Sequence, residues 1–400
     1  MTSSPSIRIG VDIGGTFTDV ALEIGDRRLT AKGLTTPRAP EQGVLTIIRT
    51  VIAAADIKPD DVDLIIHGTT LATNALIERK GAKTALLTTE GFRDVIEIRH
   101  ENRFEQYDIN IDLPPPLVPR RLRLPIRERV DAQGQVLVPL DGDSITRALD
   151  ALATQNIEAV AVGFLHSFTN PDHERRLGEA IARRFPDMAV SLSSEVSPEM
   201  REYERFSTAC ANAYLQPLMG SYIARLEREL TTSGFRCPLL LMTSGGGITT
   251  TDTAIRFPVR LVESGPAGGA IFAAAIARQN GLDDVVSFDM GGTTAKICFI
   301  DKGRAQTARM FEVARIYRFV KGSGLPLRIP VIEMVEIGAG GGSIASVDAL
   351  GRITVGPESA GSEPGPVCYR RGGSAPTVTD ADLVLGRIDP ATFSAGKVEC

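Results

Sequence analysis

One short pattern occurs twice in this chain: an aspartate, an apolar residue, two glycines and a threonine. The first copy occupies residues 12–16 and the second occupies residues 289–293. Each copy follows an apolar run with the character of a strand. A strand that delivers an aspartate into a tight glycine turn suits magnesium–phosphate chemistry, because the carboxylate takes the metal while glycine amides approach phosphate oxygens. Two copies therefore predict two related lobes that hold one nucleotide.

Side-chain chemistry assigns a role to each member of the repeat. Asp12 and Asp289 are the predicted Mg²⁺ ligands, directly or through water, and they are also candidate catalytic residues. Lys296 follows the second copy. It can be a solvated strand residue, so it is not included among the predicted site residues. The predicted phosphate contacts are Gly14, Gly15, Thr16, Thr18, Gly291, Gly292, Thr293 and Thr294.

A third glycine cluster, Gly340, Gly341 and Gly342, follows an apolar stretch at residues 329–337. Glycine clusters mark turns or a close approach of backbone to a ligand. We therefore expect these residues to contact the adenosine or the phosphates. Glu333 and Glu336 lie just before the cluster. The sequence is equally consistent with their facing the site and with their being exposed strand residues.

Two further segments are candidates for the same site. Residues 263–269 read Glu-Ser-Gly-Pro-Ala-Gly-Gly before an expected helix, so they form either an anion site at a helix N-terminus or a capped helix packed closely on a sheet. His67 ends a buried apolar run at residues 64–66, a position where α/β proteins often bind ligands. The hydroxyls that follow it and Asn74 make His67 a catalytic candidate, although a lone histidine is more often structural.

Composition narrows the class of protein. The 400 residues are 43% hydrophobic and 23% charged with a formal net charge of −5, which is typical of a soluble globular protein and argues against a nucleic-acid partner. The five cysteines contain no C-x-x-C pair, which fits a reducing compartment and offers no zinc or iron–sulfur framework. No apolar run approaches the length of a membrane span. We expect a cytoplasmic protein that contacts neither nucleic acid nor membrane.

The order of elements indicates an α/β protein with mixed sheets flanked by helices. Residues 1–190 are expected to form a first lobe that carries the first phosphate turn, and residues 191–400 a second lobe that carries the other turn and the glycine-rich segment. One helix is expected to start at Ser197 and to be kinked or broken at Pro217, with a second helix over residues 218–230. No P-loop, nucleophile elbow or H-E-x-x-H motif is present in the sequence.

The paired turns resemble those of the actin, sugar-kinase and heat-shock ATPase superfamily, and further motifs sharpen the match. In order along the whole chain they are residues 12–19 (DIGGTFTD), 67–78 (HGTTLATNALIE), 244–247, 263–269 (ESGPAGG), 289–296 (DMGGTTAK) and 337–345 (IGAGGGSIA). Together they resemble the hydantoinase A/5-oxoprolinase family, which also contains ATP-binding subunits of acetone and acetophenone carboxylases.

This resemblance implies a two-lobed actin-like ATPase fold that binds ATP and Mg²⁺. It implies phosphorylation of the carbonyl oxygen of a cyclic amide of the hydantoin or 5-oxoproline type, followed by ring opening with water, and a hydantoinase B-type partner subunit. The alternative within the family is the ATP-binding subunit of a ketone carboxylase. A sugar kinase shares the paired turns but not the other motifs as a set, and an ATP-gated activator usually holds an iron–sulfur cluster. Because family members usually run further, the second lobe is expected to be incomplete.

Overall fold

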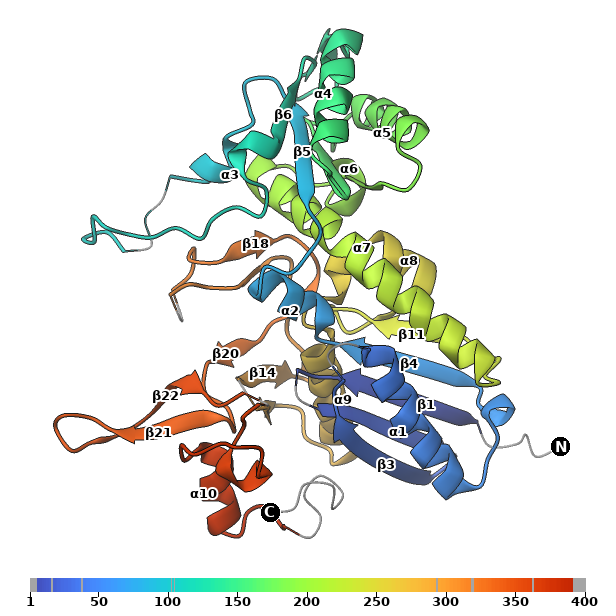
Figure 1. Ribbon diagram of the computed structural model, residues 1–400, viewed down its shortest axis with the longest axis vertical. Helices are drawn as coiled ribbons and strands as arrows, with labels where there is room; N and C mark the ends of the chain where they lie inside the picture. The colour runs from blue at the N-terminus through green and yellow to red at the C-terminus, as the bar shows by residue number, and fades with distance from the viewer. Residues whose placement is uncertain are drawn as a thin grey trace.

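The computed structural model describes residues 6–390 except 16, 37–38, 102, 104, 293, 318–319 and 362. Strands and helices alternate along it, and mixed sheets are flanked by helices, as predicted (Figure 1). The largest sheet has six strands in the order β12-β11-β4-β1-β2-β3. Its strands are β1 (Ile7–Ile13), β2 (Phe17–Ile24), β3 (Arg27–Leu34), β4 (Leu64–Thr69), β11 (Leu239–Met242) and β12 (Ile248–Thr250).

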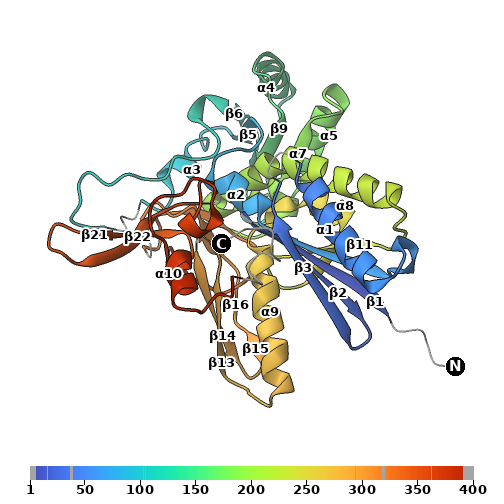
Figure 2. The ribbon, with the colours of Figure 1, turned by 60° about the horizontal axis from the view of Figure 1, so that its bottom comes forward.

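Two sets of helices cover this first sheet. Helices α1 (Pro40–Ala55) and α7 (Glu202–Thr232) contact each other, and α1 packs on β2 and β3 (Figure 2). Helix α9 (Ser264–Gln279) instead contacts β4 and β11. Within β1, Ile9, Val11 and Ile13 are buried in the core with α1 and α7, whereas Asp12, which alternates with them, lies on the other face. The short α2 (Leu71–Ile77) follows β4 directly.

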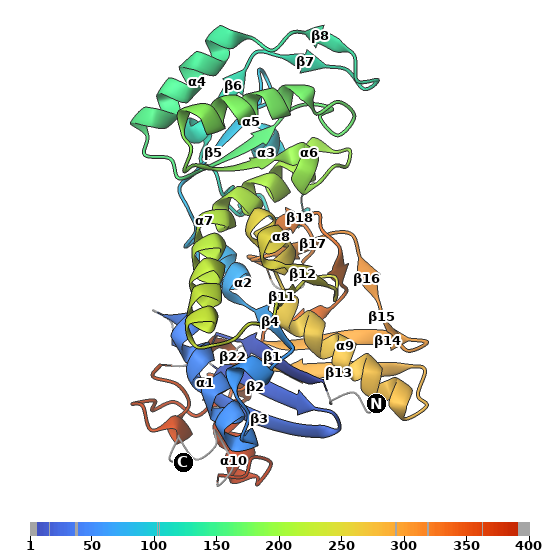
Figure 3. The ribbon, with the colours of Figure 1, turned by 90° about the vertical axis from the view of Figure 1, so that its right-hand side faces the viewer.

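A second sheet is entirely parallel, in the order β10-β9-β5-β6. It forms a separate layer with α4 and α5 at the far end of the molecule from β1–β3 (Figure 3). Its strands and helices are β5 (Thr84–Thr89), β6 (Arg123–Ile126), β9 (Ala159–Gly163), β10 (Ala189–Leu192), α3 (Val95–Ile98), α4 (Gly142–Thr154), α5 (Asp172–Arg184) and α6 (Ser193–Val196).

The third sheet carries the second copy of the repeat. It pairs β13 (Val285–Met290) with β14 (Ala295–Asp301), and β14 with both β15 (Arg304–Ala305) and β20 (Val335–Ile337). Helix α9 packs on β13, β14 and β15. The remaining elements are the strand pairs β7 (Arg129–Val130) with β8 (Val136–Val138), β16 (Thr307–Ala308) with β19 (Val331–Ile332), β17 (Phe311–Val313) with β18 (Leu325–Leu327), and β21 (Ser343–Val347) with β22 (Ile353–Ser359), and the helices α8 (Thr251–Arg256) and α10 (Val378–Val384).

The prediction of a helix start at Ser197 and a break at Pro217 is wrong. Helix α7 begins at Glu202 and runs without interruption through Pro217 for 31 residues. Its first half is buried against the parallel sheet, and its second half is buried with α1 and the first sheet. Two separate cores thus hold the helix on either side of the proline, which outweighs the hydrogen bond that proline removes.

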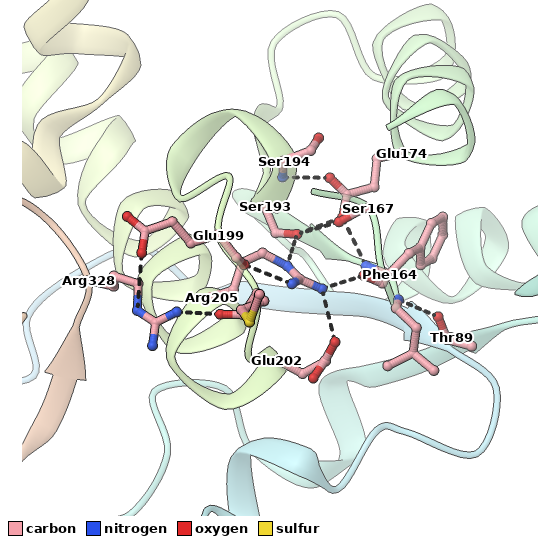
Figure 4. Close-up of polar contacts among 12 residues, drawn as sticks. Thr89, Phe164, Ser167, Glu174, Ser193, Ser194, Glu199, Glu202, Arg205 and Arg328 are labelled. Atoms are coloured by element: carbon pink, nitrogen blue, oxygen red, sulfur yellow. Dashed lines mark hydrogen bonds and ion pairs between the residues drawn. The ribbon is translucent and has the colours of Figure 1, made fainter. Parts of the chain in front are cut away.

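The start of α7 is fixed to the parallel sheet by buried charges (Figure 4). The guanidinium of Arg205 donates to the carbonyl oxygen of Phe164 at 2.7 Å and to Ser193 Oγ at 3.2 Å. Glu174 Oε1 accepts hydrogen bonds from Ser193 Oγ at 2.7 Å and from Phe164 N at 2.9 Å. Because each buried charge has several partners, this network makes α7 a rigid connection between the two sheets.

The division of the chain into lobes at residues 1–190 and 191–400 remains a prediction, and the first sheet includes strands from both ranges. Strands β11 and β12, from the predicted second lobe, complete the sheet that begins with β1. The chain therefore returns to the first sheet before it forms the third. None of the helices in the described part of the chain combines the length and apolarity that a membrane crossing requires.

Candidate functional site

The two copies of the repeat form hairpins of the same register. In the first, Asp12 pairs with Asp19 across the strands, and Gly14 N donates to Phe17 O at 2.8 Å. In the second, Asp289 pairs with Lys296, and Gly291 N donates to the carbonyl oxygen of Thr294 at 2.9 Å. The sequence repeat is therefore also a repeat of backbone structure. Thr16 and Thr293, predicted phosphate contacts, lie outside the described residues.

Helix α9 lies between the two aspartates. A Cβ on Gly265 would come within 2.8 Å of Asp12 Oδ1, and a Cβ on Gly269 would lie 3.6 Å from Asp289 Oδ2. Residues four apart share one face of a helix, so the first turns of α9 present a bare glycine face toward both carboxylates. This helix start is the segment 263–269 for which the sequence left an anion site and close packing open. The structure shows close packing against the two carboxylates, and the anion site stays a prediction.

Asp12 is in an unusual environment. Its Oδ1 is buried and has no hydrogen-bond partner among the described residues. A Cβ on Gly68 would come within 3.0 Å of this oxygen, so glycines enclose it from β4 as well as from α9. Burial, reinforced by the carboxylates of Asp19 and Asp289 and opposed by Lys32, raises the pKa of Asp12 to about 6. A buried carboxylate oxygen without a donor is costly unless a cation or another partner satisfies it.

These features fit a magnesium ion held by Asp12 and Asp289. Mg²⁺ keeps several waters and binds through one or two carboxylates together with phosphate oxygens, rather than in a cage of protein ligands. Among the described residues, no three His, Cys, Asp or Glu side chains are grouped for metal binding. Asp289 is exposed, so water and a phosphate can reach it.

The start of α9 is tied to β4, to α2 and to the second hairpin. Ser264 Oγ donates to Thr69 O at 3.0 Å and accepts from Thr69 N, and Glu263 N donates to Thr73 Oγ1 at 2.9 Å, which fixes the helix to the end of β4 and to α2. Glu263 also forms an ion pair with Lys296 of β14, in which both side chains are largely buried. Lys296, which the sequence left as a solvated residue, therefore connects the second hairpin to the helix.

The predicted threonines and glycines of the turns divide into two groups. Thr18 is buried, and its Oγ1 lies 3.2 Å from Thr35 Oγ1, which donates to Gly14 O at 2.9 Å. Thr18 therefore supports the first turn from behind. Gly15 and Gly292, by contrast, are exposed at the tips of the two turns.

His67 lies on the face of the sheet opposite Asp12. It pairs in register with Val11 on the parallel strand β1, so its ring enters the core with α7. Tyr222 of α7 forms a 2.8 Å hydrogen bond with His67 Nε2, and burial lowers the pKa of His67 to about 4. The structure brings Asp12 and Asp289 to α9 but does not bring His67 to them.

Gly341 and Gly342 support the second turn through their backbone, whereas Gly340 N donates to Ser343 Oγ at 3.0 Å. Gly341 N donates to Gly291 O at 2.9 Å and Gly342 N donates to Gly292 O at 2.7 Å. A Cβ on Gly342 would come within 2.9 Å of Gly292 O. A Cβ on Gly341 would instead meet Thr379 Oγ1 at 2.5 Å, so both glycines lie where the chain packs closely. Glu336 pairs with Lys296 on β14, and Glu333 lies just before β20.

Some residues of the site had no clear signal in the sequence. Lys32 binds both carboxylate oxygens of Asp19, at 2.8 and 2.9 Å, and its ammonium lies over the ring of Phe17. Thr35 holds the first turn, as described above. Both residues lie on or just after β3, outside the repeated motif, and only the register of β3 against β2 places them at the site.

Known protein families match this chain over almost its whole length. Residues 8–185 match the hydantoinase/oxoprolinase N-terminal region, and residues 205–399 match the hydantoinase/oxoprolinase domain. The chain belongs to the hydantoinase/oxoprolinase family. This family member is 38% identical to the caprolactamase subunit alpha of Pseudomonas jessenii over 99% of its own length and 57% of the relative. It is 35% identical to the acetophenone carboxylase gamma subunit of Aromatoleum aromaticum over 98% of its length and 54% of the relative.

Solved structures confirm the fold of this family member. The crystal structure of the ATP-dependent caprolactamase from P. jessenii matches with a TM-score of 0.82 and 37% identity, over 98% of this chain and 56% of that one. A nucleotide-free acetone carboxylase structure matches with a TM-score of 0.80 and 25% identity, over 97% of this chain and 56% of that one. The chain thus spans just over half the length of these relatives.

Proposed function

We propose that this chain binds Mg²⁺·ATP between its two hairpins and belongs to an ATP-dependent hydrolase of cyclic amides. The observation that carries the proposal is the pair of matched turns whose aspartates face one glycine stripe of α9. Family membership supports it, because the caprolactamase structure is described as ATP-dependent. The substrate is proposed to be a hydantoin, a 5-oxoproline or a related lactam.

Different residues of the site are proposed to bind the metal and the phosphates. Asp12 and Asp289 would hold Mg²⁺, which, when bound, neutralises negative charge on the phosphates. Gly14, Gly15, Gly291 and Gly292 form turns whose backbone can approach phosphate oxygens, with the exposed Gly15 and Gly292 at their tips. Thr16, Thr18, Thr293 and Thr294 are proposed to contact the phosphates or to support these turns, and Gly340, Gly341 and Gly342 to support the second turn.

The proposed reaction uses ATP to activate a poor electrophile. The amide carbonyl oxygen attacks the γ-phosphorus, the bond to the β–γ bridging oxygen breaks, and ADP leaves. Water then adds to the activated carbon, and the ring C–N bond breaks with protonation of the nitrogen, which leaves an acyl phosphate. A second water hydrolyses the acyl phosphate to the carboxylic acid and inorganic phosphate. The first step needs positioning and charge stabilisation and no protein nucleophile, which agrees with the absence of a nucleophile elbow from the sequence.

A carboxylase is the second candidate. The acetophenone carboxylase gamma subunit is almost as similar as the caprolactamase subunit, and the acetone carboxylase fold matches nearly as well. In this alternative, ATP activates a ketone and bicarbonate supplies the carboxyl group. The caprolactamase and acetophenone carboxylase relatives are both named as subunits, which supports a hydantoinase B-type partner for this chain. A cytoplasmic location is proposed because the five cysteines of the sequence contain no C-x-x-C pair and their number is odd.

The test is ATP turnover measured with each substrate class, with and without a partner subunit and bicarbonate. The substrates are 5-oxoproline, hydantoin, caprolactam, acetone and acetophenone. The hydrolase proposal expects ADP release that depends on a cyclic amide and ignores bicarbonate. ADP release that requires both a ketone and bicarbonate would replace it with the carboxylase.

A further inference from the structure

A second polar feature lies away from the two hairpins, at the end of α3. Arg99 follows that helix with a φ of 60° and a ψ of −128°, a backbone conformation that favours glycine. Such a conformation is unfavourable and persists only when its surroundings fix it. The contacts of the Arg99 side chain are part of these surroundings.

The guanidinium of Arg99 is only partly satisfied. Nη2 donates to the carbonyl oxygen of Pro114. Nε and Nη1 are buried and have no hydrogen-bond partner among the described residues. A guanidinium has donors on every nitrogen and cannot accept, so both atoms require an acceptor that the described part of the protein does not supply. A buried, incompletely paired cation is costly in the free protein.

Arg99 lines a small cavity between α3, the proline-rich segment at residues 114–117, α7 and β18. The cavity itself measures about 20 Å³ and, with its mouth, about 340 Å³. Space of this size holds roughly one water-sized group, while a larger molecule can extend through the mouth. No residue of the two hairpins lines the cavity.

The charge of the cavity is defined by Arg99 alone, because no other lining residue is ionic. Burial raises the pKa of Tyr203 and of Cys210 to about 12, so the phenol and the thiol are neutral. Two carboxylates lie nearby. Glu204 Oε1 contacts His100 at 2.8 Å, while Glu204 Oε2 is buried without a hydrogen-bond partner among the described residues. Glu312 accepts from Gly322 N at 2.8 Å. The cavity therefore offers one cation with free donors, together with the hydroxyls of Tyr203 and Ser207.

We propose that this cavity binds a carboxylate-type anion, with its oxygens on Nε and Nη1 of Arg99. Hydrogen bonds between ions of opposite charge are short and strong, and a guanidinium suits a planar oxyanion. Such a group reaches the cavity either as part of an organic acid or as bicarbonate. The site extends beyond the proposed nucleotide function, since it requires neither ATP nor Asp12.

The test compares anions that differ only in charge or source, using the whole chain. Thermal unfolding and titration calorimetry are run with sodium acetate, with acetamide as its neutral isostere, and with sodium bicarbonate, at ionic strength balanced by sodium chloride. The proposal predicts saturable stabilisation by acetate or bicarbonate but not by acetamide. The tighter of the two binders identifies the source as an organic acid or as inorganic carbon.

Two variants separate binding from backbone strain. Arg99→Gly removes the guanidinium and relieves the strained backbone, so it should fold at least as well as wild type and bind the anion roughly 10–100-fold more weakly. Arg201→Gly is the matched control, because Arg201 also has a positive φ, of 87°, but is exposed and lines no part of the cavity. It should bind like wild type. Equal binding by Arg99→Gly and Arg201→Gly, or equal effects of acetate and acetamide, would overturn the proposal.

Discussion

Asp12 and Gly265 are packed so closely that a Cβ at position 265 would lie 2.8 Å from Asp12 Oδ1. Real Cβ atoms do not approach so near, so Gly265→Ala must displace the carboxylate or the start of α9. We expect the affinity for Mg²⁺·ATP to fall at least about tenfold, as measured by calorimetry, since losing one charged contact has that cost. Gly142→Ala is the control, because its Cβ would meet nothing within 4 Å. It should leave nucleotide binding unchanged and stabilise the protein by up to about 1 kcal/mol.

Asp12 also gives the stability of the protein a pH dependence. Its pKa is about 6 in the folded protein against an ordinary value of 3.8. Between these values the folded protein binds more protons at Asp12 than the unfolded chain, so stability falls as pH rises through this window. We expect Asp12→Asn to remove this fall, which amounts to up to about 3 kcal/mol, in urea unfolding across the same pH range. An unchanged pH profile in this variant would contradict the burial of an unpaired carboxylate.

His67 contributes to the pH dependence of stability with the opposite sign to Asp12. Its pKa falls from 6.5 to about 4 on folding, so the unfolded chain binds more protons and stability rises with pH over that interval. In the wild type the two residues therefore oppose each other between about pH 4 and pH 6. Asp12→Asn should reveal the rising profile, and His67→Gln should reveal the falling one. The double variant should be flatter than either single variant.

Tyr222→Phe tests whether His67 supports the fold or takes part in chemistry. The variant removes the hydroxyl on His67 Nε2 and leaves that nitrogen buried without a partner. We expect the free energy of unfolding to fall by about 1–3 kcal/mol, with ATP turnover per folded molecule unchanged. A large loss of turnover in a protein of wild-type stability would restore His67 as a catalytic residue.

The ion pair between Lys296 and Glu263 should matter more than the one between Lys32 and Asp19. The first is largely buried, whereas the side chains of the second are 42% and 50% exposed. Lys296→Met leaves Glu263 without its cation at the start of α9, so it should destabilise the protein by about 1–3 kcal/mol and weaken nucleotide binding. Lys32→Met should cost less than about 1 kcal/mol. Equal effects in chemical denaturation would mean that α9 is not held by this pair.

Much of this architecture could be predicted from the sequence, because the two hairpins depend on local signals. An alternating strand, a Gly-Gly turn and a returning strand fix the register within a few residues, and both copies fold alike. Helix α1 occupies residues 40–55, where the apolar spacing in the sequence is typical of a helix. The packing of α9 between the hairpins could not be predicted, because it depends on residues far apart in the chain.

Other predictions depended on facts that only tertiary structure supplies. The face of the sheet occupied by His67 follows from its pairing with Val11, and no local pattern reveals that register. A Cβ at Gly342 would meet the backbone oxygen of Gly292, and a Cβ at Gly341 would meet the side chain of Thr379; composition cannot distinguish such packing from contact with a ligand. Pro217 remains inside a helix because two separate cores hold α7 on either side of it.

The most direct test of the account is titration calorimetry of ATP into the protein, with and without Mg²⁺, for the wild type, Asp12→Ala and Asp289→Ala. We predict that the wild type binds ATP with Mg²⁺ and that each variant binds at least about tenfold more weakly, because each aspartate supplies a charged contact to the metal. The loss should be smaller without Mg²⁺. Wild-type affinity in either variant, or wild-type binding that does not respond to Mg²⁺, would contradict the shared metal site.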